Sequence, residues 1–139
     1  MSQGLSSPEK VLTYSLLVNG SVYGSQSALN AYQFACALIE RGHKLVSVFF
    51  YQDGVHNASS LVVPANDEFN LTKAWQQLSV QHEVRLESCV AASLRRGILD
   101  SNEAKTHERD SSNVAKGLEL AGLGGLAEAM LVQDRLVQF

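Results

Sequence analysis

Runs of β-branched and aromatic residues alternate along this chain with segments of helical spacing. The two clearest runs are residues 11–18 (VLTYSLLV) and residues 44–51 (KLVSVFFY), and both are apolar over most of their length. A strand with one face in water alternates polar and apolar residues, whereas a strand covered on both faces is largely apolar. The pattern therefore predicts an α/β fold, a three-layer sandwich in which a mainly parallel sheet of about five strands is flanked by helices.

Two longer segments, one on each side of the second run, have the spacing of amphipathic helices. The first is predicted to begin after Ser25 or Ser27 as N-cap and to end at Gly42. The second is predicted to begin after Asn66 or Asp67 and repeats apolar residues at intervals of three and four. Each helix has the length needed to cross over between two parallel strands.

The second half of the chain predicts shorter elements that complete the same alternation. Strands are expected over residues 84–90, 118–121 and 134–139, the last at an edge of the sheet, helices over residues 91–97 and 123–133, and an exposed loop or irregular helix over residues 100–110. The working groups of such sheets lie beyond the carboxyl ends of the strands. Segments far apart in sequence are therefore expected to meet there.

Length and charge limit the class of protein. The chain has 139 residues, which predicts a single domain over residues 11–139, preceded by a flexible polar tail over residues 1–10. The net charge of -3 and the absence of a Lys/Arg run argue against direct nucleic-acid binding. The tail has no apolar signal core, no run is long enough to span a membrane, and two cysteines form no CxxC pair. These features predict a protein of the reducing cytoplasm.

Cys89 is the strongest candidate for chemistry. It lies where the strand over residues 84–90 meets the short helix that follows. The amides and positive dipole of a helix start can hold a thiol as its reactive thiolate. The alternative is that Cys89 is a small buried apolar residue that ends a core strand. The other cysteine, Cys36, lies among apolar residues of a predicted helix and is expected to be inert.

Arg95 and Arg96 follow Cys89 within the same short helix. They are candidates for stabilising a thiolate or persulfide, or for facing an acidic partner. Equally, they are placed to complement the negative C-terminal end of that helix. Both interpretations stay open at the level of sequence.

The remaining motifs favour no cofactor or metal. The loop over residues 20–24 (GSVYG) offers a possible anion cradle, but it fits neither GxGxxG nor a P-loop, so a turn that lets backbones cross closely is the better interpretation. The four histidines have no paired metal-ligand spacing, so a zinc site is not predicted. No GxSxG motif and no paired carboxylates stand out.

Several segments together resemble the DsrE-like sulfurtransferase family. The matching segments are residues 23–26 (YGSQ), 31–35 (AYQFA), 48–55 (VFFYQDGV), 74–78 (AWQQL), 89–97 (CVAASLRRG) and 134–139 (DRLVQF). The resemblance extends from about Val11 to Phe139 and implies that Cys89 occupies the position of the family's sulfur-carrying cysteine. Tyr23, Arg95 and Arg96 lie within the matching segments and are candidates for supporting site residues.

The resemblance also implies partners and a pathway. It implies that the chain works in a heterohexamer, a dimer of heterotrimers with TusB-like and TusC-like subunits. In that complex the chain would accept sulfane sulfur from a TusA-like carrier as a cysteine persulfide and pass it to a TusE-like acceptor. The sulfur would serve 2-thiouridine formation at the wobble position of certain tRNAs. The terminal thiolate is expected to be partly exposed, because a partner cysteine has to approach it.

Three alternatives are open at this point. The chain is also compatible with a DsrE-type sulfur carrier of bacterial sulfur oxidation, which has the same fold and site but other partners. It is compatible with a non-catalytic assembly subunit of such a complex, although the matching Cys89 argues against this. A flavodoxin-like redox protein is a more distant alternative.

Overall fold

The computed structural model describes residues 10–139, so the tail predicted over residues 1–10 lies, apart from Lys10, outside the described residues. Five strands form one sheet in the order β4-β3-β2-β1-β5, and every pair of neighbouring strands is parallel. The strands are β1 (Thr13–Val18), β2 (Lys44–Phe50), β3 (Arg85–Cys89), β4 (Leu118–Ala121) and β5 (Arg135–Gln138). The parallel sheet predicted from the continuous apolar runs is confirmed, with the last strand at one edge.

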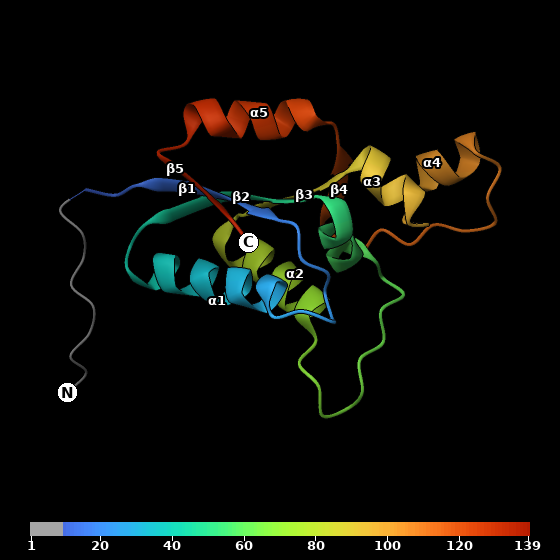
Figure 1. Ribbon diagram of the computed structural model, residues 1–139, viewed down its shortest axis with the longest axis horizontal. Helices are drawn as coiled ribbons and strands as arrows, with labels where there is room; N and C mark the ends of the chain where they lie inside the picture. Colours follow the sequence, from blue (N-terminus) through green and yellow to red (C-terminus); the bar gives the residue numbers. More distant parts are fainter. Residues whose placement is uncertain (1–9) are drawn as a thin grey trace.

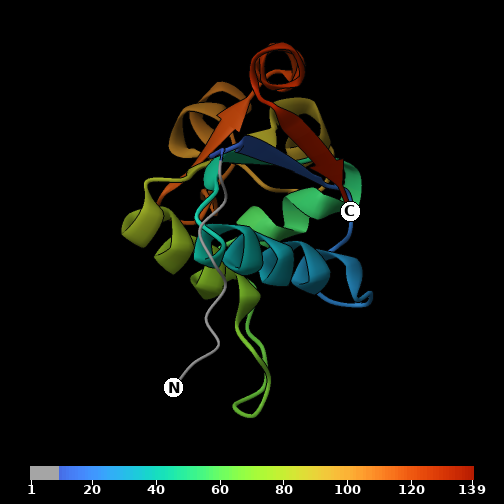
Figure 2. The ribbon, with the colours of Figure 1, turned by 90° about the vertical axis from the view of Figure 1, so that its left-hand side faces the viewer.

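Helices cover both faces of this sheet. They are α1 (Ser27–Glu40), the 3-10 helix η1 (Gln52–Ala58), α2 (Leu71–His82), α3 (Val90–Arg95), α4 (Ser101–Thr106) and α5 (Leu123–Val132). Figure 1 shows α1 and α2 below the sheet and α5 above it, with α3 and α4 beyond the end of β3. Figure 2, turned by a quarter, shows the resulting three layers and the long loop between η1 and α2 that extends away from the body.

Two apolar clusters hold the layers together. The larger lies between the sheet and the helices α1 and α2, and it includes Leu16, Val48, Phe50 and Trp75, each fully buried. Side chains alternate between the two faces of a strand, so their sequence neighbours point to the other face. There a second, smaller cluster forms around Phe49. Burial on both faces of the sheet explains why the runs that form β1 and β2 are apolar over most of their length.

Helix starts differ from the sequence prediction. The N-cap of α2 is Asn70, whose side chain accepts a hydrogen bond from the Lys73 amide at 3.1 Å, and neither Asn66 nor Asp67 caps it. Residues 65–68 instead form a turn in which Glu68 donates from its amide to the Ala65 carbonyl and accepts from the Ala65 amide. The chain therefore turns before the helix begins.

The first helix shows a smaller difference. Gln26 holds the N-cap position of α1 without a side-chain hydrogen bond, in place of Ser25 or Ser27. Gly42, at φ 89, follows the helix end as predicted. The charged segment after residue 100 contains the short helix α4, capped by Asp100 through the Glu103 amide at 2.8 Å.

Candidate functional site

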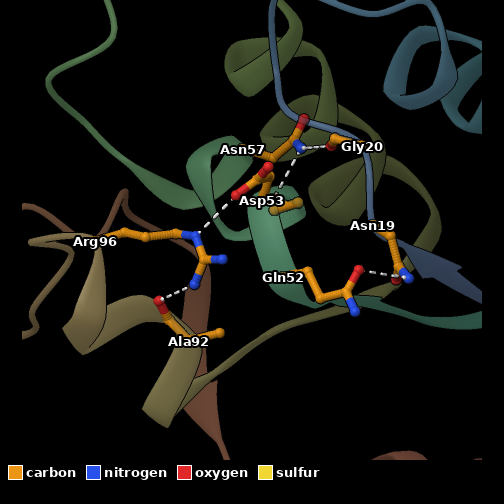
Figure 3. A network of polar contacts seen from close by, with 8 residues as sticks. Asn19, Gly20, Gln52, Asp53, Asn57, Ala92 and Arg96 are labelled. Atoms are coloured by element: carbon orange, nitrogen blue, oxygen red, sulfur yellow. Dashed lines mark hydrogen bonds and ion pairs between the residues drawn. The ribbon is translucent and has the colours of Figure 1, made fainter.

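The carboxyl ends of β1, β2 and β3 meet at one edge of the sheet. Because the strands are parallel, the segments that follow them gather at the same edge. These segments are residues 19–20 after β1, η1 after β2, and Cys89 with α3 after β3. Figure 3 shows the polar contacts that join them. The convergence expected from sequence is therefore found.

Cys89 is the last residue of β3 and the N-cap of α3, as the sequence indicated. It lies opposite Ala121, the last residue of β4. Its side chain makes no capping hydrogen bond with the helix. In this conformation the amides at the start of α3 do not hold the sulfur.

The thiol is covered, contrary to the expectation that it is partly exposed. Cys89 is 3% exposed and packs in the smaller apolar cluster with Phe49, Val55, Ala92 and Ile98. The cover comes from three directions: β2, η1 and the chain around α3. In this structure Cys89 therefore offers a partner cysteine almost no surface.

Arg96 joins α3 to η1. Its Nε donates to Asp53 Oδ1 at 3.0 Å, and its Nη1 donates to the Ala92 carbonyl at 3.0 Å (Figure 3). The second contact is the helix-end role that the sequence left open. Arg95 is exposed and makes no ion pair within residues 10–139. No hydrogen bond in the described part of the chain joins either arginine to Cys89.

Asn57 anchors η1 to neighbouring segments at this edge of the sheet. Its side chain is fully buried, and its amide group donates to the carbonyls of Gly54 at 2.8 Å and Gly20 at 3.2 Å (Figure 3). Its Oδ1 accepts from the Trp75 indole at 3.2 Å, and its backbone carbonyl accepts from the Thr72 hydroxyl at 3.0 Å. Asn57 thus ties η1 to the segment after β1 and to α2. The sequence analysis did not single out this residue.

Gly54 fixes the path of η1 against β1. A Cβ at this position would lie 1.9 Å from the Val18 carbonyl oxygen, so no larger residue fits without moving the backbone. The Asp53-Gly54 turn predicted from sequence is thus also a point of close backbone contact. Just before it, Gln52 adopts φ 52 and its side chain accepts from the Asn19 amide group at 3.2 Å.

Tyr23 lies away from the thiol. Its hydroxyl donates to the Phe69 carbonyl at 2.6 Å, and its ring packs against the larger cluster on the face of α1 and α2. The GSVYG loop is a close-packed turn, since a Cβ at Gly20 would overlap the Ser27 hydroxyl. The structure therefore does not bring Tyr23 together with Cys89, Arg95 or Arg96.

Cys36 behaves as a packing residue on α1. It is half-buried beside Tyr32. The pKa of Tyr32 is raised above its ordinary value, first by burial and then by the hydrogen bond and charge of Cys36. Within residues 10–139, no three His, Cys, Asp or Glu side chains are gathered closely enough to hold a metal ion. No helix among these residues is long and apolar enough to cross a bilayer.

Comparison with known proteins gives a consistent result. Residues 13–139 match the DsrE/DsrF-like family. The chain is 70% identical over 128 residues to the "Sulfurtransferase TusD homolog" of Vibrio vulnificus strain YJ016, an alignment that covers 92% of this chain and 98% of that protein. It is 53% identical over 128 residues to "Sulfurtransferase TusD" of Photorhabdus laumondii, with 92% and 98% covered.

A solved structure supports the fold independently. The ychN protein from E. coli superposes with a TM-score of 0.75 at 24% identity, and the match covers 93% of this chain and all of that one. This likeness concerns the fold alone.

Proposed function

Because this chain belongs to the DsrE/DsrF-like family and is a sulfurtransferase, we propose that it carries sulfane sulfur on Cys89 as a persulfide. The observation that carries the proposal is the place of Cys89: it ends β3 at the edge where the segments after three parallel strands converge. Cys36, the other thiol, packs on α1 against the opposite cluster. The proposal is therefore that one sulfur does the chemistry.

The reaction is a thiol–persulfide exchange that needs no oxidant or cofactor. The Cys89 thiolate attacks the outer sulfur of a donor persulfide, R–S–SH. A new sulfur–sulfur bond forms on Cys89, the donor's bond breaks, and the products are Cys89–S–SH and the donor thiolate R–S⁻. A downstream thiolate then takes the outer sulfur in the same way. Such exchange is fastest when the attacking thiol titrates near ambient pH.

We infer the relay from the family. A TusA-like carrier donates the sulfur, a TusE-like protein accepts it, and TusB-like and TusC-like subunits assemble with this chain as a dimer of heterotrimers in the cytoplasm. The sulfur ends as 2-thiouridine at the tRNA wobble position. Support for assembly comes from exposed apolar residues on α5, where Leu131 is 87% exposed and Met130 is 59% exposed. Leu123 and Val132 on the same helix are exposed as well, and a contiguous exposed apolar patch is typical of a protein–protein contact.

Intact mass spectrometry tests the persulfide directly. The wild-type chain and the variants Cys89→Ser and Cys36→Ser are incubated with a cysteine desulfurase, cysteine and a TusA-like carrier, with TusB-like and TusC-like subunits present. Wild type and Cys36→Ser are expected to gain one sulfur atom that a reductant removes, whereas Cys89→Ser gains none. Transferable sulfur on Cys89→Ser would overturn the assignment.

Burial of Cys89 favours one second candidate, a non-catalytic assembly subunit. A thiol that is 3% exposed is a normal core residue. The same experiment decides between the two. Assembly with the related subunits but no sulfur on any cysteine of this chain would support the structural role.

A further inference from the structure

We propose that Arg96 is a positioning residue: its ion pair with Asp53 holds α3 against η1 and keeps Cys89 covered until a sulfur donor docks. The inference rests on the proposed function, because it concerns how the sulfur-carrying thiol is reached. It assigns to Arg96 control of access rather than contact with the sulfur. It assigns no such role to Arg95.

The ion pair joins two of the elements that cover Cys89, η1 and α3. Val55 belongs to η1 and Ala92 to α3, and both are fully or almost fully buried in the same smaller cluster as Cys89. Thiol exchange requires the incoming sulfur to approach the attacked or attacking sulfur closely. Separation of α3 from η1 is the opening of this cover that the ion pair controls.

The two elements that the ion pair links, η1 and α3, are anchored to different parts of the fold. On the η1 side, Asn57 and Gly54 fix the backbone against β1 and α2. On the α3 side, a buried hydrogen bond of 2.8 Å between the hydroxyls of Ser88 and Ser93 ties the helix to β3. The opening we infer is thus a local separation of α3 from η1, with the helix itself retained.

The ion pair between Arg96 and Asp53 links α3 to η1 at the protein surface. The arginine side chain is 27% exposed and its Asp53 partner is 66% exposed. An ion pair so close to water is weak and is screened by salt, which suits a contact that must open and close during function. The bond from Arg96 to the Ala92 carbonyl keeps the guanidinium aligned toward η1.

Alkylation of Cys89 measures access without any sulfur donor. In a Cys36→Ser background, only Cys89 reacts with iodoacetamide, a neutral reagent. The rate is compared on the plateau at high pH, where the thiol is ionised in every variant and arginine keeps its charge. Asp53→Asn and Arg96→Gln are expected to raise this rate about 2- to 5-fold, the size of effect that loss of a surface ion pair gives.

Arg95→Gln is the matched control, since it removes a positive charge from the neighbouring position at the end of α3 without touching Asp53. Its plateau rate should equal that of the parent, and Asp53→Glu should restore slow alkylation. Raising NaCl from about 0.05 M to 1 M should speed the parent but not Asp53→Asn, because only the parent has the pair to screen. A general loss of stability would not produce this difference in salt response.

Equal plateau rates for the parent, Asp53→Asn and Arg96→Gln would overturn the inference. So would alkylation of the parent at the rate of free cysteine, which would mean that Cys89 is not covered in solution. The result is separable from the test of the proposed function. Failure of Cys89 to take up sulfur leaves the alkylation rates unaffected, and equal alkylation rates leave persulfide formation intact.

Discussion

At the scale of single residues, Asn57 is the side chain on which most of the site geometry depends. It is 0% exposed, and its side chain donates to two carbonyls and accepts from one indole N–H. A buried polar group that loses its hydrogen-bond partner is costly, because it was removed from water and gains nothing in return. Truncation of Asn57 therefore affects three neighbours at once.

We predict that Asn57→Ala lowers the free energy of unfolding by about 2–4 kcal/mol, from unsatisfied groups and a small cavity together. Urea unfolding measures the change. Asn66→Ala is the control, because Asn66 is an exposed loop residue, and its effect should stay within about 0.5 kcal/mol. Similar stabilities for the two variants would show that the Asn57 contacts are not maintained in solution.

The sequence predicted the place of Cys89 but not its surroundings. A strand followed directly by a helix start is a local pattern, and it put Cys89 at the end of β3 correctly. Its cover comes from Phe49, Val55 and Ile98, which lie on three other segments, and no local pattern tells which distant residues close over a thiol. The ion-pair partner of Arg96 could not be predicted for the same reason, because Asp53 is 43 residues away in the sequence.

At the scale of elements, one carboxylate adds to the backbone pairing that fastens the edge strand β5 to β1. Asp134 Oδ2 accepts from the Thr13 amide at 2.8 Å and from the Thr13 hydroxyl at 3.0 Å, just before β5 pairs with β1. These hydrogen bonds favour the charged form, so the pKa of Asp134 is lowered from its ordinary value of 3.8. The attachment of β5 is therefore sensitive to acid.

The sign of the pH effect follows from this lowered pKa. The contribution of Asp134 to stability is fully present above the unfolded value of 3.8 and is lost as the pH falls through the lower folded value. We predict that Asp134→Asn melts at a lower temperature than wild type at pH 7 and that the difference narrows below about pH 4. Thermal melts across pH measure it.

Asp110→Asn serves as the control, because Asp110 is exposed and forms no ion pair in the described part of the chain. Its melting temperature should follow wild type at every pH. A gap between Asp134→Asn and wild type that is constant with pH would mean that the carboxylate charge does not fasten β5.

Strands were predicted more securely than helix starts. The continuous apolar runs at β1 and β2 mark strands buried on both faces, and this pattern depends on burial that the whole sheet imposes. A cap depends on which of several polar residues the chain presents after its last turn. Asn66, Asp67 and Asn70 are all suitable in type, and only the turn at residues 65–68 selects Asn70.

At the scale of the whole molecule, the sheet couples the two apolar clusters. β2 contributes Phe50 to the larger cluster and Phe49 to the smaller one, so neither face of the sheet is independent of the other. The single tryptophan, Trp75, is fully buried in the larger cluster and bonded to Asn57. Trp75 fluorescence therefore reports on the larger cluster, while the alkylation rate of Cys89 reports on the smaller cluster on the other face of the sheet.

We predict that residues 11–139 unfold as one domain. In urea, Trp75 fluorescence, far-UV circular dichroism and the protection of Cys89 from alkylation in the Cys36→Ser background should change over the same concentration range, because loss of β2 removes both clusters at once. Below that range, alkylation of Cys89 should report only the local separation of α3 from η1. A Cys89 transition complete well before that of Trp75 would instead show that the smaller cluster unfolds by itself, with β1, β2 and the larger cluster still folded.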